Sequence, residues 1–339
     1  MNRIPTLDGW RGFAITLVLF DHVQHALLGR YVRPWTQTGQ HGVTIFFVLS
    51  GFLITSKLIQ APIDLKSFYT RRFFRLMPAA WAYLAFVLLL GAITRIPFTN
   101  PAGVLSCLLF YRNYVGNWAG GVTGHFWSLS LEEQFYLVWP CILLLAGIRR
   151  SLWIAALGAI ACAVFRFAFW AKYNQGIAST QSQVRADALL VGCILAILLA
   201  DARNIAFATR WSVRLALPAL AAVLFAIARY HWLAPLFESV SIAILIALTM
   251  LHRSAWFARP FSLAPIAWLG TISYSLYLWQ ELFTDFRGPW ALAVGLPLFA
   301  LASYYCIERP FNRLGHRLTR RPALERQLAP NPMTPAEEK

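Results

Sequence analysis

Residues 42–56 read Gly42-Val-Thr-Ile-Phe-Phe-Val-Leu-Ser-Gly-Phe-Leu-Ile-Thr-Ser56 and contain no charged side chain. A helix needs about 20 mainly apolar residues to cross a bilayer. This run approaches that length when the residues up to 59 are included. The stretch therefore predicts a membrane-spanning helix, and similar apolar runs recur along the whole chain.

The composition of the 339-residue chain supports the same class of protein. Apolar residues make up 58% of the chain and charged residues 13%, whereas soluble domains are typically about half apolar and one quarter charged. So much apolar and aromatic residue excludes a disordered chain, a coiled coil and a collagen-like fibre. A single soluble core could not bury this many long apolar runs. The sequence predicts an all-α, polytopic membrane protein.

Proline, glycine and charge clusters divide the chain into ten predicted transmembrane helices. Their ranges are 10–28, 42–59, 78–96, 128–148, 151–171, 184–201, 212–230, 236–252, 264–283 and 290–308. The stretch 97–127 holds only one short apolar run, Gly103 to Phe110. We expect a loop there that can re-enter the membrane.

The basic residues are distributed unevenly between the two sides of this ten-helix arrangement. With the N-terminus in the cytoplasm, twenty Lys and Arg residues fall in cytoplasmic segments and seven in outer segments, as the positive-inside rule requires. Topology and anionic lipids account for the net charge of +16, and no nucleic-acid-binding module is visible. We expect both termini in the cytoplasm, one transmembrane domain over 1–321 and a disordered cytoplasmic tail over 322–339.

The first predicted helix carries the ionisable residues Asp8, Arg11, Asp21 and His22, which are costly inside a bilayer and mark candidate functional positions. Arg11 and His22 are eleven residues apart, so they lie on one stripe of a helix, about 16 Å apart along its axis. An imidazole titrates near neutral pH, which makes His22 a candidate general base. The structural alternative is an interfacial arginine and a hydrogen-bonded core histidine.

A second polar group begins at His125 and continues into the start of the fourth predicted helix. Glu132 is predicted to face the interior and to orient or charge-balance His22. Asp21 is less suited to that role, because adjacent helical residues point about 100° apart. The neighbouring Glu133 has the spacing of a helix cap as its structural alternative.

A basic cluster lies on the predicted cytoplasmic side and contains Arg71, Arg72 and Arg75. Arg72 and Arg75 are three residues apart and share a helix face. Guanidinium groups bind phosphate oxygens well because their donors form a planar fork. Ordinary positive-inside charge is the alternative interpretation.

Two small residues, Ser50 and Gly51, stand in the middle of the second predicted helix. Such a pair lets another helix or a ligand approach the backbone closely. No metal site is predicted, because the five cysteines occur singly and without metal-ligand spacing.

Eight motifs, in order along the chain, resemble the acyltransferase 3 family of integral-membrane acyltransferases. They are Leu7-Asp-Gly-Trp-Arg-Gly-Phe-Ala14, Asp21-His22, Phe46-Phe-Val-Leu-Ser-Gly-Phe-Leu-Ile-Thr55, Phe68-Tyr-Thr-Arg-Arg-Phe-Phe-Arg-Leu-Met-Pro78, His125-Phe-Trp-Ser-Leu-Ser-Leu-Glu-Glu-Gln-Phe-Tyr136, Arg185-Ala-Asp-Ala-Leu-Leu190, Ile272-Ser-Tyr-Ser-Leu-Tyr-Leu-Trp279 and Glu308-Arg-Pro-Phe311. The family's Arg-x10-His pair falls on Arg11 and His22, and its Arg-x-x-Arg motif falls on Arg72 and Arg75.

The resemblance implies a ten-helix enzyme of the bacterial inner membrane. Such an enzyme moves an acyl group, often acetyl, from cytoplasmic acyl-coenzyme A to a hydroxyl of a polysaccharide, lipopolysaccharide, glycolipid or glycoside. Acyl-coenzyme A is then a co-substrate, and no permanently bound cofactor is expected. The chain departs from many relatives at Gln280, where they have histidine, and at Thr44, where they have an acidic residue. The glutamine leaves His22 as the favoured base.

We therefore predict an O-acyltransferase in which His22 is the base, Glu132 its partner and Arg11 a ligand of the donor's pantetheine arm. The predicted phosphate ligands of coenzyme A are Arg71, Arg72 and Arg75, and the predicted supporting side chains are Asp21, His125 and Ser50. Two alternatives stay open. One is a non-catalytic transporter or flippase of a lipid-linked sugar, whose path intramembrane charges would equally mark. The other is acyl transfer to an amine.

Overall fold

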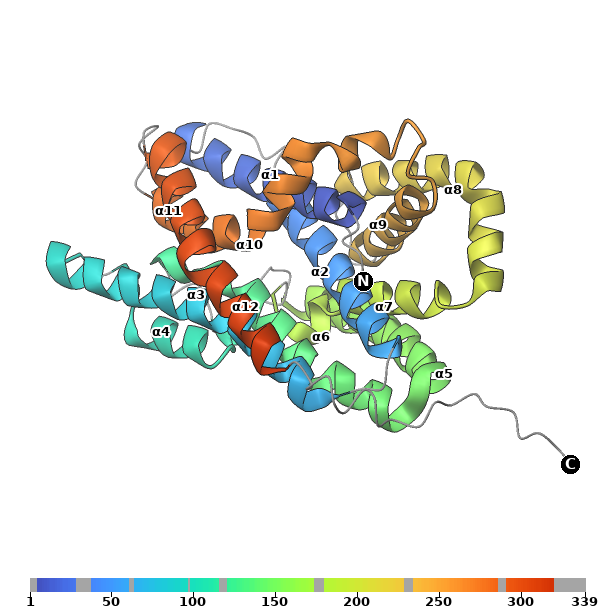
Figure 1. The fold of residues 1–339 in the computed structure, drawn as a ribbon, viewed down its shortest axis with the longest axis horizontal. Coiled ribbons are helices and arrows are strands. Elements are labelled where there is room, and N and C mark those ends of the chain that lie inside the picture. The colour runs from blue at the N-terminus through green and yellow to red at the C-terminus, as the bar shows by residue number, and fades with distance from the viewer. Residues whose placement is uncertain are drawn as a thin grey trace, which may run out of the picture.

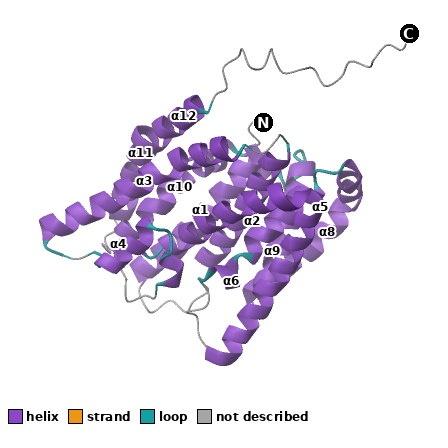
Figure 2. Ribbon diagram, turned by 90° about the horizontal axis from the view of Figure 1, so that it is seen from below, coloured by secondary structure: helices purple, strands orange, loops and turns teal. Residues whose placement is uncertain are grey.

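The computed structural model describes residues 5–28, 38–60, 64–96, 98–115, 121–173, 180–228, 234–285 and 291–319. In these ranges every regular element is a helix or helical turn, and no strand is present (Figure 2). The all-α prediction is confirmed. The predicted disordered tail at 322–339 lies outside the described residues.

The helices follow one another along the chain as Figure 1 labels them. Their bounds are α1 Pro5–Leu28, α2 Thr38–Ile59, α3 Leu65–Thr94, α4 Pro101–Leu108, α5 Phe126–Tyr173, α6 Ser182–Arg185, α7 Asp187–Leu198, α8 Ala202–Ala228, α9 Ala234–Leu251, α10 Ala264–Asp285, α11 Leu296–Ser303 and α12 Arg309–Leu318. Short 3-10 turns occur at Arg112–Tyr114, Gly121–Thr123 and Arg259–Ser262, and π-helical turns at Ala291–Gly295 and Tyr304–Glu308.

Each of the ten predicted segments overlaps a helix, but two of them share one. The segments at 128–148 and 151–171 are the halves of α5, which is interrupted at Gly147, where φ is +73°. Glycine adopts this left-handed conformation without a steric penalty, so the chain can turn there between two helical halves. The predicted loop at 97–127 contains α4, whose eight residues are too few to cross a bilayer.

Four helical segments of the described chain are long and apolar enough to cross a membrane. They are Thr38–Ile59, Leu65–Thr94, Gly121–Phe169 and Ala234–Leu251. A fifth is added if α7 and the start of α8, which meet at 104°, form one span. The fold is therefore consistent with a membrane protein. The ten-span count and the cytoplasmic position of both termini are not confirmed and stay predictions.

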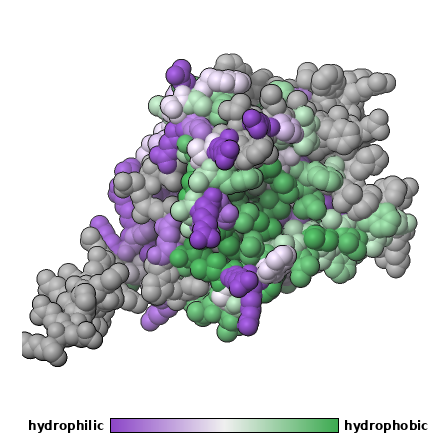
Figure 3. Space-filling model, turned by 90° about the vertical axis from the view of Figure 1, so that its right-hand side faces the viewer, coloured by the Kyte–Doolittle hydropathy of each residue, from purple (hydrophilic) through white to green (hydrophobic). Residues whose placement is uncertain are grey.

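The surface also indicates contact with lipid. Figure 3 shows a broad hydrophobic area on one face of the molecule, with hydrophilic residues along its borders. Large apolar side chains on α3 and α5 point outward, among them Ile93, Leu145 and Trp153, which are 70%, 83% and 65% exposed. Apolar surface of this extent marks a membrane or protein contact rather than a water-exposed face.

Helix α1 lies between α10 and α2, and two glycines set its distance from α10 (Figure 1). A Cβ atom at Gly270 would lie 1.8 Å from the carbonyl oxygen of Asp8, and one at Gly12 would lie 2.0 Å from that of Ile266. No side chain fits at either position. These contacts hold Gly12 of α1 level with residues 266–270 of α10. His22, farther along α1, lies near Glu281, farther along α10, so the two helices run parallel.

Helices α2 and α7 are also in close contact through glycines. A Cβ atom at Gly51 would lie 1.9 Å from the carbonyl oxygen of Leu189, and one at Gly192 would lie 2.1 Å from that of Val48. The close approach predicted from the Ser50-Gly51 pair is therefore a helix–helix contact at Gly51. Ser50 points to a different neighbour, described below.

We expect Gly270→Ala to destabilise the fold, because its methyl group would overlap backbone and push α1 away from α10. Overpacked cores typically lose about 1–3 kcal/mol. Gly158→Ala is the matched control, because its Cβ would meet only the end of the Leu190 side chain, at 3.0 Å. Thermal unfolding in detergent should show a lower melting temperature for Gly270→Ala than for Gly158→Ala. Equal melting temperatures would contradict the close packing of α1 on α10.

Candidate active site

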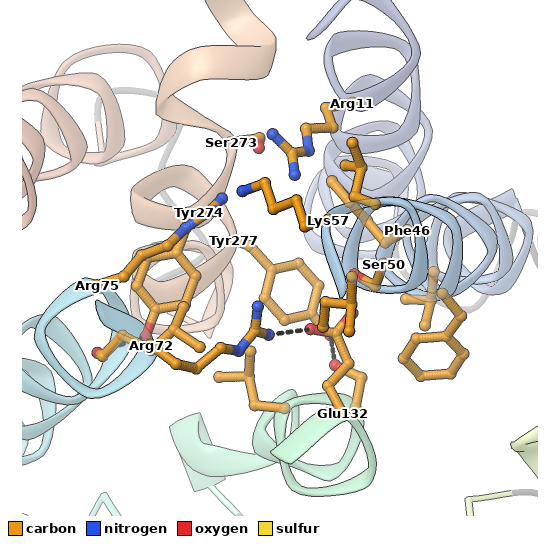
Figure 4. Close-up of a pocket in the computed structure, with 17 residues that line it drawn as sticks. Arg11, Phe46, Ser50, Lys57, Arg72, Arg75, Glu132, Ser273, Tyr274 and Tyr277 are labelled. Atoms are coloured by element: carbon orange, nitrogen blue, oxygen red, sulfur yellow. Dashed lines mark hydrogen bonds and ion pairs between the residues drawn. The ribbon is translucent and has the colours of Figure 1, made fainter. Parts of the chain in front are cut away.

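A pocket lined by four cationic side chains lies between α1, α2, α3, α5 and α10 (Figure 4). Its cavity is about 110 Å³, which is room for a few water molecules or a short acyl group. The four side chains are Arg11, Lys57, Arg72 and Arg75, and we call this site the cationic pocket. Glu132 contributes a carboxylate to its wall.

The Glu132 carboxylate is the centre of a buried polar network. Its Oε1 accepts a hydrogen bond from the Ser50 hydroxyl at 2.9 Å, and its Oε2 accepts one from the Tyr136 hydroxyl at 3.0 Å. Arg72 lies 3.8 Å from Glu132 and 3.5 Å from Glu133, and its guanidinium stacks on the Tyr136 ring at 3.2 Å. Two carboxylates and an aromatic face thus compensate one largely buried cation.

The other three cations form a positive region at one end of the pocket. Lys57, at the exposed end of α2, lies within electrostatic range of Arg75 and Arg11. Arg11 has Asp8 as an acidic neighbour at 3.7 Å on its own helix. Sequence analysis missed Lys57 as a site residue, because a lysine at the end of an apolar helix fits the positive-inside pattern equally well.

Arg71 is the predicted phosphate ligand that the structure leaves out of the pocket lining. Its Nε donates to the carbonyl oxygen of Ser67, one turn earlier in α3. Helix α12 packs beside it, with Gly315 against Phe74. Burial lowers the pKa of His316, on α12, and the charges of Arg71, Lys57 and Arg75 lower it further. The part of this lowering that is due to the three charges reflects the positive potential around this end of α3.

Helix register separates Glu132 from His22. A Cβ at Gly39 of α2 would touch Asp21 of α1, and a Cβ at Gly42 would touch residues 14 and 18. The antiparallel pairing therefore brings Ser50 level with about residue 10 of α1. Glu132, which is bonded to Ser50, consequently lies at the level of Arg11, and His22 is about 16 Å farther along α1. The prediction that Glu132 orients His22 needs correction. The Glu132 carboxylate is hydrogen-bonded to Ser50 and Tyr136 at the level of Arg11, at the opposite end of the helix face that Arg11 shares with His22.

Glu281 occupies the place near His22 that the sequence analysis gave to Glu132. Its Oε2 is 3.0 Å from Nδ1 of His125, whose side chain is 1% exposed. His22 is close enough to Glu281 to interact with its charge. We call these three residues the histidine–glutamate cluster. Sequence analysis gave Glu281 no role, because it stands alone after an aromatic run and belongs to no motif.

Asp21, a predicted supporting side chain, points toward the start of α2. Its Oδ1 accepts a hydrogen bond from the Thr38 hydroxyl at 3.4 Å. A Cβ at Gly39 would lie 2.7 Å from its Oδ2. The Thr44 hydroxyl donates to the carbonyl oxygen of Gln40 within α2.

Tyr277 connects the cationic pocket with the histidine–glutamate cluster. Its ring lines the pocket, and its hydroxyl is 2.6 Å from the Ser128 hydroxyl, which also lines it. The same Tyr277 hydroxyl donates to the carbonyl oxygen of His125 at 3.2 Å. The two sites are therefore neighbours along α10, with the Tyr277–Ser128 contact between them. In the described part of the chain, no group of three or more potential metal ligands is close enough together to hold an ion.

Comparison with known proteins identifies the family. Residues 4–307 match the family model described as an acyltransferase domain. The chain belongs to the acyltransferase 3 family. No solved structure matches it.

Relatives of the chain include named O-acetyltransferases. The peptidoglycan O-acetyltransferase OatA of Listeria monocytogenes is 28% identical over 313 residues, covering 82% of this chain and 49% of the relative. YrhL of Bacillus subtilis (strain 168), provisionally named a peptidoglycan O-acetyltransferase, is 29% identical over 368 residues, covering 93% of this chain and 56% of the relative. The chain thus spans about half the length of the curated relatives it matches.

We expect Arg72→Met to destabilise the protein strongly, because it leaves Glu132 and Glu133 buried without their cation. Breaking a buried pair by removing one partner typically costs about 3–5 kcal/mol. Arg71→Met is the matched control, since within the described chain the Arg71 guanidinium donates to a carbonyl on its own exposed helix face and pairs with no carboxylate. Unfolding in detergent should separate the two variants clearly. Similar stability of both would mean that the network around Glu132 does not hold the helices together.

Proposed function

We propose that the protein is a membrane O-acyltransferase that moves an acyl group, an acetyl group in the first place, from acyl-coenzyme A to a hydroxyl of a carbohydrate. The observation that carries this proposal is the connection of the cationic pocket, through Tyr277, to the histidine–glutamate cluster. One end offers cations for an anionic donor, and the other offers imidazoles for proton transfer. Membership of an acyltransferase family supports the same reaction.

The donor would enter at the end of the pocket where Lys57 and Arg75 lie. Coenzyme A carries several phosphate oxygens, and guanidinium and ammonium groups are their usual protein ligands. Arg11, deeper in the pocket, would contact the pantetheine arm. Arg72 is already paired with Glu132 and Glu133, so its role is to hold the pocket wall rather than to bind phosphate. The thioester would then reach Ser128 and Tyr277.

The transfer step requires a base for the acceptor hydroxyl. His22 would take the hydroxyl proton as the oxygen attacks the thioester carbonyl carbon. The new C–O bond forms, the C–S bond breaks, and the proton passes to the departing sulfur, so that free coenzyme A and an ester are the products. No oxidant, metal or second co-substrate is needed for this balance.

The membrane orientation is part of the proposal. The excess of basic residues in alternate loops supports ten spans, with both termini in the cytoplasm of a bacterium and the protein in its inner membrane. The mouth of the cationic pocket at Lys57 would then face cytoplasmic acyl-coenzyme A, and the histidine–glutamate cluster would face the outer side. Labelling of a cysteine introduced at Lys66 from the outer side would contradict this orientation.

The relatives' names support a glycan acceptor. OatA of Listeria monocytogenes is named a peptidoglycan O-acetyltransferase, and we propose carbohydrate hydroxyls of the cell surface as the acceptor class here too. The direct test supplies detergent-solubilised protein with acetyl-coenzyme A and chitotetraose. We expect thiol release and a product heavier by one acetyl group. A preparation that neither transfers nor hydrolyses the thioester would contradict the proposal and favour a transporter.

We expect Arg75→Gln to raise the KM for acetyl-coenzyme A by about tenfold or more, because a charge-assisted hydrogen bond to phosphate contributes about 1.5–3 kcal/mol. Arg71→Gln, four residues away on the same helix and outside the pocket lining, should change it less than twofold. Initial rates of thiol release measure both variants. Equal effects of the two substitutions would mean that general positive potential, not the pocket, attracts the donor.

We expect His22→Gln to lower kcat by about 10²–10⁴-fold while the affinity for acetyl-coenzyme A stays near that of the wild type. Glutamine has a similar size and forms hydrogen bonds, but it cannot accept the hydroxyl proton. The chitotetraose assay gives kcat, and equilibrium binding of coenzyme A gives the affinity. Turnover near the wild-type value in a folded His22→Gln protein would remove His22 from the base role.

A further inference from the structure

The pair formed by His125 and Glu281 is not explained by the reaction steps given so far. His125 comes just before α5, and Glu281 comes from the last turns of α10, 156 positions later in the sequence. Their Nδ1 and Oε2 atoms are 3.0 Å apart. Among the described residues neither ring nitrogen of His125 has a hydrogen bond of regular geometry, so the Nδ1–Oε2 contact is a close charge contact and Nε2 is buried without a partner. A carboxylate beside one imidazole nitrogen, with the other nitrogen unpartnered, resembles the arrangement of a proton-transferring histidine.

We propose that Glu281 is a positioning residue of the acyl transfer, which holds His125 so that its imidazole shares proton transfer on the acceptor side with His22. This inference rests on the proposed function. The carboxylate fixes the imidazole by binding Nδ1 and stabilises the positive charge that the ring gains when Nε2 accepts a proton. The same carboxylate is within electrostatic range of His22, so the His125–Glu281 pair lies beside the proposed base, while only His125 is positioned by direct contact.

The surroundings of His125 support a fixed ring. Tyr83, Phe126 and Tyr277 surround it, with ring centroids 5.4, 4.9 and 5.6 Å from its own. Aromatic side chains restrict its rotation but offer no second carboxylate. Glu281 is therefore the acidic group that the structure places against this imidazole.

Gly124 lies directly against the Glu281 carboxylate and leaves it little room to move. A Cβ atom there would lie 3.0 Å from Oε1 and 3.2 Å from Oε2 of Glu281. A side chain at this position would crowd the carboxylate without removing its charge. This gives a way of moving Glu281 relative to His125 while leaving both residues in the chain.

The test uses the full-length protein in detergent with acetyl-coenzyme A and chitotetraose. We expect Glu281→Gln, which keeps the size but loses the charge, to lower kcat at least tenfold while the KM for acetyl-coenzyme A changes less than twofold. In a His125→Ala background, which is itself slow, adding Glu281→Gln should lower kcat by less than a further twofold, because Glu281 would have no imidazole left to position. A full additional tenfold loss, or wild-type turnover of Glu281→Gln, would overturn the proposal.

Two further variants keep the test valid if Glu281→Gln folds poorly. Gly124→Ala should lower kcat several-fold by displacing the carboxylate, and Gly158→Ala, whose Cβ meets a leucine methyl group at the same 3.0 Å, should leave kcat unchanged. Equal activity of these two variants would also overturn the proposal. A wild-type protein that neither transfers the acetyl group nor hydrolyses the thioester would instead contradict the proposed function itself, so the two failures are distinguishable.

Discussion

The contact of α1 with α10 through Gly12 and Gly270 is the constraint on which the arrangement of the site depends. Backbone touches backbone at this contact, so the two helices have one spacing and one register. That register directs Arg11 into the cationic pocket and brings His22 near Glu281, eleven residues farther along α1. A larger side chain at either glycine would shift α1 relative to α10, so that Arg11 and His22 would both move. The close packing of small residues thus fixes the geometry of the proposed site as well as the fold.

The free-energy cost of burying a charge among apolar helices explains why the buried charged side chains are grouped in two polar centres, one around Arg72 and one around His125. An unpaired ion is costly in such surroundings, whereas a cation that meets carboxylates and an aromatic face is tolerated. Arg72 has Glu132, Glu133 and the Tyr136 ring, and His125 has Glu281. Tyr277 links the two centres through hydroxyl contacts. In the proposed reaction the two centres would have different roles, with the cationic pocket binding the anionic donor and the His125–Glu281 pair assisting proton transfer.

Much of the architecture was predictable from local sequence, while the pairings between helices were not. Apolar runs indicated helices throughout, and the Ser50-Gly51 pair indicated a close helix contact, which the structure shows at Gly51. The partner of Glu132 was predicted wrongly, because the level at which α5 crosses α2 is a tertiary property. Lys57 and Glu281 were missed for a related reason. Each is a single charge at the end of an apolar helix, and only packing brings it to its neighbours.

The claim that the cationic pocket binds the donor, with its acyl end at Tyr277, can be tested most directly by photolabelling. A coenzyme A thioester carrying a 4-azidobenzoyl group is irradiated with the solubilised protein, and the modified peptides are identified by mass spectrometry. We predict labelling of the pocket-lining parts of α2 and α10 around Phe46 and Tyr277, abolished by excess acetyl-coenzyme A. Labelling confined to the outward faces of α5 or α8, or unaffected by acetyl-coenzyme A, would contradict it.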